Sequence, residues 1–368
     1  MGEIRLMNVT KKFGDFTAVN DISLTIDDCK FFSFLGPSGC GKTTILRMIA
    51  GFEMPTEGRV FLDNQDITDV PSYKRPVNTI FQNYSLFPHM SIFDNVAFGL
   101  KIKKLDKHQI KEQVEKILTI VQMQDHKFKF PNQISGGQMQ RVAIARALVN
   151  EPKVLLLDEP VAALDLKLRQ KMIIELMNIH DLFGITFIYV THDQGEAMSL
   201  SDNVAIVNQG KIVQVGKPDD IYERPNSIFS AFFIGDTNLI SGTVVNKHDD
   251  YIEVLTEFSL NNENVILDSN YTFDVNVGDK VTLSLRPEKI AISNRSPNKQ
   301  SDFNILKGKI EDILYLGTHT QYIVQVGKHK FKVFNQHKKV YFDDNALDWY
   351  DEVYLYWHDT DSFVIQGK

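Results

Sequence analysis

A glycine-rich segment between an apolar run and a helical pattern carries the clearest chemistry of this chain. It fits G-x-x-x-x-G-K-[ST], follows the run Phe31 to Leu35 and precedes the helical pattern Ile45 to Ala50. Its residues are Gly36, Pro37, Ser38, Gly39, Cys40, Gly41, Lys42, Thr43 and Thr44. In this context glycines let backbone N–H groups point into one concavity, to which the helix presents its positive end. We predict a phosphate-binding loop in which Lys42 reaches the β- and γ-phosphates of a nucleotide and Thr43 holds Mg²⁺; a glycine turn with a solvated lysine is the alternative.

Two adjacent acids end a second apolar run. Val154 to Leu157 is followed by Asp158, Glu159 and Pro160, as in a strand that is buried on both faces and ends at the ligand crevice of an open α/β sheet. Neighbouring side chains on a strand point to opposite sides. Asp158 is therefore a candidate for holding Mg²⁺-bound water, and Glu159 for orienting and deprotonating the water that attacks a γ-phosphate. A plain Asp-Glu-Pro turn is the alternative, which the upstream phosphate loop disfavours.

A second glycine-rich helix start lies between these motifs. Ser135, Gly136, Gly137 and Gln138 precede a helical pattern from Met139 to Val149. Ser135 is a natural N-cap, and the two glycines leave N–H groups open to an anion. Alone, such a start is more typical of a plain cap. Together with the other two motifs, it predicts a second anion-binding helix end.

Composition and charge exclude several classes of protein. The 368 residues are 43% hydrophobic and 24% charged, with a formal net charge of −7, which is ordinary soluble composition and argues against a nucleic-acid partner. The longest apolar runs fall far short of the roughly 20 residues of a membrane span. Cys29 and Cys40 make no disulfide framework. We expect a cytosolic, reducing environment and a link to the membrane only through a partner.

The pattern of elements predicts two domains. Residues 1–236 alternate strand-like runs with helical patterns, which indicates an α/β domain with a largely parallel sheet. Within it, residues from about 84 to 150 carry helical periodicity and indicate an inserted helical subdomain. Residues 237–368 contain short alternating strands with turn signals, typical of a small all-β barrel or sandwich. In this second domain, lysines at alternate positions, Lys328, Lys330 and Lys332, indicate the exposed face of a strand rather than a basic binding patch.

The order of these motifs resembles the ATP-binding cassette (ABC) family, whose signals also include Gln82 and His192. The resemblance covers nearly the whole chain and implies ATP and Mg²⁺ as cofactors. It implies that Phe13 stacks on the adenine, that Gln82 touches the metal and senses the γ-phosphate, and that His192 contacts that phosphate. It further implies a head-to-tail dimer in which the Ser135 to Gln138 helix start of one copy caps the ATP of the other, with Asp165 in the loop between them.

Each implied role has an ordinary structural alternative. Phe13 can be a core aromatic residue, Gln82 can simply end an edge strand, and His192 can belong to a capping turn. Two positions also depart from the family pattern. Ile134 replaces a leucine, which conserves volume, and Ala162 replaces a serine whose hydroxyl would bridge to the opposing nucleotide site.

A closer resemblance is to the ATPases of bacterial polyamine (spermidine/putrescine) importers. It rests on Asn64 to Thr68, Val77 to His89 and Leu164 to Arg169, and Leu285 to Glu288 resembles the small OB-like regulatory (TOBE-type) barrel of such proteins. It implies an ATP-hydrolysing subunit at the cytoplasmic face of the membrane, which works with permease subunits and indirectly with a solute-binding protein. Tyr84 to Leu100 is then a docking groove for the permease, or else a buried core.

Three other functions remain open from the sequence. The solute can be a sugar, iron or another ion, because importer ATPases share most of these motifs. A soluble ABC ATPase of translation or repair is a further alternative, although the single phosphate loop and the acidic balance disfavour it. The third is a nucleotide-gated regulator in which the β domain binds a ligand.

Overall fold

The computed structural model describes residues 2–82, 84–162, 164–260, 263–271, 274–297, 303–337 and 347–365. The chain divides into two compact units, Met1–Asp219 and Asp220–Lys368. The first strand of the second unit begins at Asn238, where the sequence pattern changes from α/β to all-β. Two short helices, α7 (Pro218–Glu223) and α8 (Ile228–Ile234), precede that strand.

The first unit contains two sheets. The strands of the antiparallel sheet are β1 (Ile4–Phe13), β2 (Phe16–Ile26), β4 (Glu57–Leu62) and β5 (Gln65–Asp66), in the order β2-β1-β4-β5. The strands of the second sheet are β3 (Phe31–Leu35), β6 (Val77–Ile80), β7 (Val154–Asp158), β8 (Thr186–Thr191), β9 (Asn203–Asn208) and β10 (Lys211–Gly216). Their order is β10-β9-β3-β8-β7-β6, and every neighbouring pair is parallel except β9 with β10.

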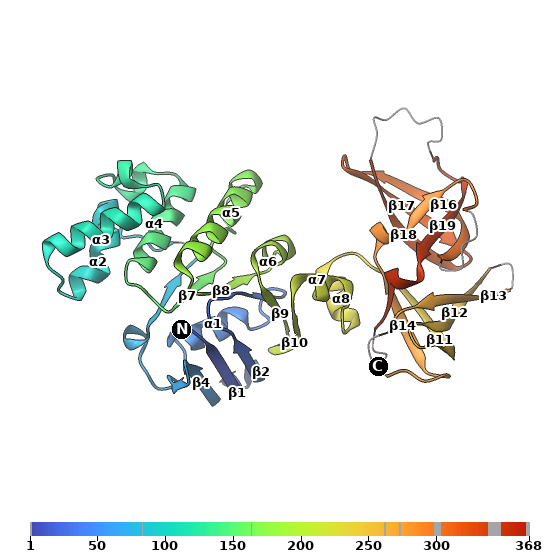
Figure 1. The fold of residues 1–368 in the computed structure, drawn as a ribbon, viewed down its shortest axis with the longest axis horizontal. Helices are drawn as coiled ribbons and strands as arrows, with labels where there is room; N and C mark the ends of the chain where they lie inside the picture. Colours follow the sequence, from blue (N-terminus) through green and yellow to red (C-terminus); the bar gives the residue numbers. More distant parts are fainter. Residues whose placement is uncertain are drawn as a thin grey trace. The chain divides into compact units, whose positions relative to one another are not determined.

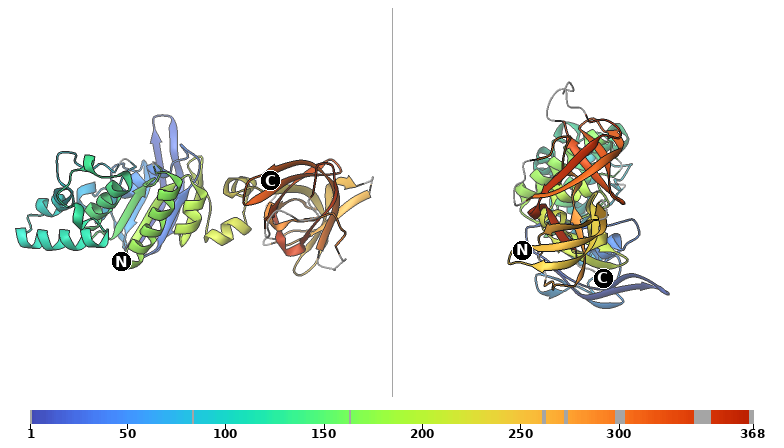
Figure 2. Two further views of the ribbon diagram at one scale, coloured as in Figure 1. Left: turned by 90° about the horizontal axis from the view of Figure 1, so that it is seen from above. Right: turned by 90° about the vertical axis from the view of Figure 1, so that its right-hand side faces the viewer.

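Helices cover both faces of the parallel sheet (Figure 1). The main helices of this unit are α1 (Lys42–Ala50), α2 (Ile92–Ile102), α3 (Lys107–Ile120), α4 (Gly136–Leu148), α5 (Leu166–Phe183) and α6 (Gln194–Leu200). Helices α2, α3 and α4 gather at one end of the unit (Figure 2). Short 3-10 turns occupy Ser72–Lys74, Gln124–His126, Pro131–Gln133, Pro287–Lys289 and Asp359–Asp361.

The apolar strands of this sheet contribute side chains to two separate hydrophobic cores, one on each face. Leu155 and Leu157 of β7 pack with the residues of α2 to α5. Leu156, between them, packs instead with α1 and the antiparallel sheet. Because side chains alternate along a strand, a run that is apolar at every position is the pattern expected for a sheet buried on both faces.

The second unit contains two five-stranded antiparallel sheets around one core. The first consists of β11 (Asn238–Lys247), β12 (Ile252–Leu260), β13 (Glu263–Ser269), β14 (Lys280–Leu285) and β20 (Ser362–Ile365). The second consists of β15 (Ala291–Ser293), β16 (Phe303–Tyr315), β17 (His319–Val326), β18 (His329–Gln336) and β19 (Glu352–His358). Residues of both sheets, such as Leu283 and Trp357, share one hydrophobic cluster. Lys330 and Lys332 form ion pairs on β18 with Glu311 and Asp236.

The predicted fold class is confirmed: an α/β unit with a helical subdomain is followed by an all-β unit. Among the described residues, no helix is both long and apolar enough to cross a bilayer. The departure at Ala162 lies at the edge of the described chain, since Ala163 falls outside it.

Within the second unit, a buried arginine fastens α8 to the end of β14. Arg286 is 3% exposed, and its guanidinium donates hydrogen bonds to the carbonyl oxygens of Tyr222, Ala231, Gly235 and Asp236. Three of these carbonyls lie at the end of α8, where a helix leaves its last acceptors unpaired. The guanidinium therefore caps the C-terminal end of α8. Because Arg286 directly follows β14, these bonds connect the helix to that strand.

Replacing Arg286 by Met keeps the apolar stem but leaves these carbonyl oxygens without their donor. We expect the free energy of unfolding of the second unit to fall by about 2–3 kcal/mol. Both tryptophans of the chain, Trp349 and Trp357, lie in this unit, so tryptophan fluorescence during urea unfolding reports on it alone. Arg295→Met, at an exposed position, is the matched control. An equally small change in both variants would contradict the anchoring role of Arg286.

Candidate active site

The glycine-rich segment forms the turn between β3 and α1. Gly39 and Gly41 have φ of +77° and +110°, the left-handed region that favours glycine. A Cβ on Gly41 would lie 2.5 Å from the carbonyl oxygen of Ala18, and one on Gly36 would lie 2.2 Å from that of Val207. The backbone therefore curls against β2 and β9 too closely for side chains, and it ends at the first N–H groups of α1, as a phosphate-binding loop requires.

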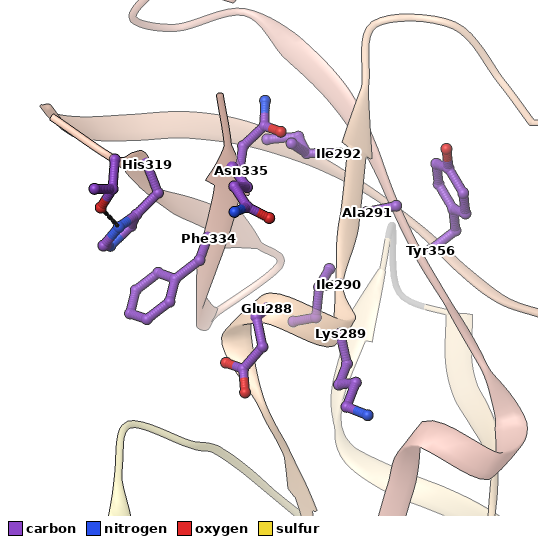
Figure 3. A pocket seen from close by; sticks show the side chains of 11 residues that line it. Glu288, Lys289, Ile290, Ala291, Ile292, His319, Phe334, Asn335 and Tyr356 are labelled. Atoms are coloured by element: carbon purple, nitrogen blue, oxygen red, sulfur yellow. Dashed lines mark hydrogen bonds between the residues drawn. The ribbon is translucent and has the colours of Figure 1, made fainter. Parts of the chain in front are cut away.

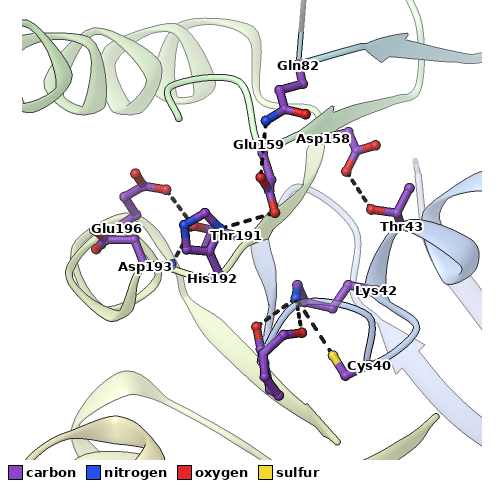
Figure 4. Close-up of polar contacts among 12 residues, drawn as sticks. Cys40, Lys42, Thr43, Gln82, Asp158, Glu159, Thr191, His192, Asp193 and Glu196 are labelled. Atoms are coloured by element: carbon purple, nitrogen blue, oxygen red, sulfur yellow. Dashed lines mark hydrogen bonds and ion pairs between the residues drawn. The ribbon is translucent and has the colours of Figure 1, made fainter. Parts of the chain in front are cut away.

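Lys42 lies folded over this loop. Its side chain is almost wholly buried, and its ammonium donates to the carbonyl oxygens of Gly36 (2.7 Å) and Pro37 (2.9 Å). The Sγ atom of Cys40 lies 3.7 Å from the same nitrogen (Figure 4). The charge of Lys42 is thus solvated by the loop itself, and the ammonium already points into the concavity.

The ends of β6, β7 and β8 bring three predicted residues together, namely Gln82, Glu159 and His192 (Figure 4). One carboxylate oxygen of Glu159 lies 3.2 Å from Nδ1 of His192, and the other accepts from the amide of Gln82 at 3.5 Å. Glu159 is therefore held from two sides by groups on two other loops. Such an arrangement fixes the orientation of a carboxylate that is to act as a base.

The backbone of Glu159 departs from ordinary strand geometry. Its φ is +47°, a conformation that costs a residue with a side chain about 1–2 kcal/mol. Its N–H donates to the carbonyl oxygen of Val190 at 3.0 Å, one residue beyond the register pair of Asp158 with Val190. This bond holds the turn that directs the Glu159 side chain toward His192.

Asp158 and Thr43 form the second half of the site. The Thr43 hydroxyl donates to Oδ1 of Asp158 at 3.0 Å. Burial raises the pKa of Asp158, and the nearby charge of Glu159 raises it further, while the bond from Thr43 opposes both. A hydroxyl and a partly buried carboxylate are oxygen donors of the kind that Mg²⁺ accepts, with the amide of Gln82 nearby as a third.

The second glycine-rich helix start is a complete capping box. The Ser135 hydroxyl accepts from the N–H of Gln138 at 3.4 Å, and the Gln138 side chain accepts from the N–H of Ser135 at 2.9 Å. Ser135 is exposed at the tip of α4. A Cβ on Gly137 would meet Leu168 at 3.2 Å, so this tip packs closely on the start of α5, where Asp165 caps the helix by accepting from Leu168 N–H. The two elements predicted to face a second copy are therefore neighbours.

Phe13 lies at the end of β1, in the hairpin with Phe16. Its side chain is 48% exposed, and the Lys11 ammonium lies 4.9 Å from the ring centroid. The alternative of a core aromatic residue is therefore wrong. Among the described residues, no hydrogen bond or ion pair joins Phe13 or the Ser135 to Gln138 helix start to the cluster around Glu159.

Two arginines to which no sequence motif assigns a role hold the loops that carry Gln82 and His192. Arg146 of α4 donates to the carbonyl oxygens of Tyr84 (3.0 Å) and Ser85 (2.8 Å), just after Gln82. Both acceptor residues have positive φ, +59° and +44°, so the arginine stabilises a strained turn. Arg169 of α5 binds Asp193 and Glu196, which follow His192. Their positions near motif ends were the only signal in the sequence.

A pocket of about 520 Å³ lies in the second unit (Figure 3). Glu288 and Lys289 line it from the turn after β14, and His319, Phe334 and Tyr356 line it from the second sheet. Its lining mixes apolar and polar side chains of both charges. The pocket is formed by residues of the second unit alone.

Comparison with known proteins adds to this geometry. The sequence model of the ABC transporter family matches residues 19–162, and that of the TOBE domain matches residues 283–365. The spermidine/putrescine import ATP-binding protein PotA of Protochlamydia amoebophila is 50% identical over 362 residues, which cover 98% of this chain and 95% of that protein. PotA of Thermotoga maritima is 48% identical over 366 residues, with 99% and 98% covered. Among solved structures, the ATP-binding cassette MJ0796, a dimer with ADP and Pi, is 32% identical with a TM-score of 0.53 and covers 58% of this chain and 98% of its own.

The raised pKa of Asp158 predicts that the ionised carboxylate lowers the stability of the folded state. A carboxyl group whose pKa is higher in the folded than in the unfolded state destabilises the fold when ionised, and the penalty vanishes below the unfolded pKa of about 3.9. Asp158→Asn keeps an acceptor for Thr43 and removes the charge. We therefore expect the variant, free of nucleotide and Mg²⁺, to melt at a higher temperature than wild type at pH 7.5 and at nearly the same temperature near pH 4.

Calorimetry at the two pH values measures this difference. Asp27→Asn, at an exposed loop position of the same unit, serves as the control for removal of one negative charge. A lower melting temperature of Asp158→Asn at pH 7.5, with the control unchanged, would show that ionised Asp158 stabilises the fold instead.

Proposed function

The chain belongs to the family of spermidine/putrescine import ATP-binding proteins, and we propose that two copies of it hydrolyse ATP at a shared interface to power polyamine import through membrane permease subunits. The observation that carries the proposal is the placement of Glu159 between Gln82 and His192, one residue from the Asp158 and Thr43 pair. The copies would act at the cytoplasmic face of the membrane, and a solute-binding protein would deliver the polyamine to the permease.

Nucleotide binding begins at the loop that Lys42 covers. The Lys42 ammonium exchanges the carbonyl oxygens of Gly36 and Pro37 for oxygens of the β- and γ-phosphates. Residues Gly36 to Thr44 supply the N–H groups and the positive helix end that hold the triphosphate. Phe13, exposed at the end of β1, offers its ring to the adenine.

Thr43, Asp158 and Gln82 are the residues that would hold Mg²⁺. When bound there, the ion neutralises charge on the phosphate oxygens. The raised pKa of Asp158 fits this role, because a carboxylate that is costly to bury gains most from a cation at its side.

Hydrolysis is assigned to Glu159. Its carboxylate takes a proton from water while the water oxygen bonds to the γ-phosphorus, and the bond from that phosphorus to the bridging oxygen breaks to release ADP. His192 contacts the γ-phosphate, and its Nδ1 keeps the Glu159 carboxylate in place. Gln82 reports the presence of the γ-phosphate to the segment that follows it, which Arg146 holds.

The second copy completes each site. Ser135, Gly136, Gly137 and Gln138 of one copy would cap the ATP on the phosphate loop of the other, with Asp165 in the contact between them. The close packing of the two elements within one copy supports a common surface. Ala162 lacks the hydroxyl usual at its position, so we expect the coupling between the two nucleotides to depend on backbone groups and Asp165.

The two parts of the chain divide the work. Residues 1–236, with the helical subdomain at about 84–150, form the ATPase domain, and residues 237–368 form the regulatory domain. Within 84–100, Ile92, Val96 and Leu100 are buried in the core, while Phe93 packs against it from a partly buried position. The docking surface for the permease is therefore the outer side of the α2 segment, whose inner side is core.

Replacing Glu159 by Gln removes the base and keeps the shape. Since a positioned base contributes about 10²–10⁴-fold, we expect ATP turnover of the assembled importer to fall by that factor while the Kd for ATP changes less than about twofold. Turnover is measured by phosphate release and binding with a fluorescent ATP analogue. Glu151→Gln, at an exposed turn, is the control and should hydrolyse at the wild-type rate. Normal hydrolysis by Glu159→Gln would remove the assignment of Glu159.

The solute is tested on the reconstituted importer. If the transporter carries polyamines, spermidine or putrescine with the binding protein should raise ATP turnover severalfold, whereas maltose and ferric ion should leave the basal rate unchanged. Stimulation by a sugar or iron alone would refute the polyamine assignment and leave the ATPase assignment intact.

A further inference from the structure

We infer that Arg169 is a positioning residue that joins the loop before α5 to His192 and thereby keeps Glu159 oriented for hydrolysis. The inference rests on the proposed function and adds a residue to its machinery. Arg169 lies in the first turn of α5, directly after the loop that ends at Asp165.

On one side, Arg169 holds the loop. Its Nη2 donates to the carbonyl oxygen of Leu164 at 3.3 Å, and its backbone N–H donates to that of Asp165 at 2.8 Å. The Leu164 side chain lies 3.7 Å from where a Cβ of Gly136 would be. Arg169 thus touches the segment that packs on the tip of α4.

On the other side, the same guanidinium reaches the segment after β8. Its Nη1 lies 3.3 Å from Oδ2 of Asp193, and its Nε lies 3.7 Å from Oε1 of Glu196. Asp193 is the residue that follows His192. One planar group therefore bridges a backbone carbonyl and two carboxylates, which a lysine ammonium cannot do with the same geometry.

Glu196 forms hydrogen bonds with both neighbours of His192, Thr191 and Asp193. Its Oε2 accepts from the hydroxyls of Tyr189 (2.8 Å) and Thr191 (2.6 Å). Thr191 in turn accepts from the N–H of Asp193 at 2.9 Å, and Asp193 accepts from the N–H of Glu196 at 3.0 Å. The residues before and after His192 are thus fixed in one closed set of hydrogen bonds (Figure 4).

The His192 side chain is largely exposed, so its position depends on the residues on either side of it in the chain. Its side chain is 53% exposed, whereas that of Glu196 is 5% exposed. Burial raises the pKa of Glu196, and the charge of Arg169 opposes that shift. The hydrogen bonds and ion pairs around the buried Glu196 carboxylate therefore supply the rigidity that the 3.2 Å contact of His192 with Glu159 requires.

Arg169→Met, Arg169→Lys and the control Lys171→Met test the inference in the assembled importer. Lys171 is exposed on the same helix. Because a displacement of about 1 Å in a catalytic group can cost about 10²-fold, we expect Arg169→Met to lower kcat at least tenfold, with the ATP Kd changed less than twofold. Arg169→Lys should recover part of the rate, since it keeps one donor, and Lys171→Met should match wild type.

A double variant guards against misfolding. Arg169→Met leaves the Glu196 carboxylate buried without a cation beside it. In the double variant Arg169→Met with Glu196→Gln, this unpaired charge is removed. We expect the double variant to melt within a few degrees of wild type and still to hydrolyse at least tenfold more slowly. A wild-type rate in a folded double variant would overturn the inference, as would a loss of ATP binding in parallel with kcat, which indicates a structural role.

A thermodynamic cycle with His192→Ala identifies the path of the effect. If Arg169 acts through His192, Arg169→Met should slow single-turnover hydrolysis less than twofold in the His192→Ala background; a further tenfold loss would overturn the coupling. The two possible failures can be distinguished. If the proposed function is wrong, Glu159→Gln hydrolyses ATP normally. If only the inference about Arg169 is wrong, Glu159→Gln is impaired and Arg169→Met hydrolyses normally.

Discussion

The site depends on the parallel pairing of β7 with β8. Asp158 lies opposite Val190 in the register, and the next bond, from Glu159 N–H to the Val190 carbonyl, forms at 3.0 Å after the strand conformation of β7 has ended. The positive φ of Glu159 turns its carboxylate across the sheet edge, where His192 follows two residues after Val190. A slip of one residue would exchange the two cores that β7 separates and would also move Glu159 away from His192. The buried sheet and the contact between Glu159 and His192 are therefore fixed by the same register.

The sequence predicts this arrangement as far as local patterns determine it. Uninterrupted apolar runs identify β3 and β7 as strands buried on both faces, and the glycine spacing identifies the curled loop before α1. The sequence does not predict Arg146, because it acts on a distant segment through backbone carbonyls, which carry no residue-type signal. It does not predict Arg169 either, because the carboxylates that Arg169 pairs with, those of Asp193 and Glu196, lie more than 20 residues away in the chain. Asp193 followed by Glu196 has the spacing of a capping box, yet the Glu196 carboxylate turns to Tyr189 and Thr191 instead. The two hydroxyl donors at the end of β8 decide that direction.

Capping and catalysis are not competing explanations for several of these residues. Ser135, Asp165 and Asp193 each accept a hydrogen bond from the first turn of the helix that follows. A cap holds the end of a loop at a rigid element, so the residues beside it gain a defined position. His192 precedes such a cap directly. The capping turn that the sequence allowed as an alternative for His192 is therefore present, and it is part of what orients the histidine.

The charged groups of the site, which are buried or half-buried, share one feature of their hydrogen bonding. Lys42, Glu196 and Arg169 each bind groups that belong to a loop or strand end rather than a single opposing charge. Because backbone carbonyl oxygens already solvate the Lys42 ammonium, the proposed ATP binding would exchange one set of oxygen acceptors for another and would not have to strip a charge from water. Asp158 differs, since its burial is opposed chiefly by one hydroxyl bond. In the proposed site, Asp158 is thus the group that would gain most from a bound cation, and without one its burial lowers the stability of the fold.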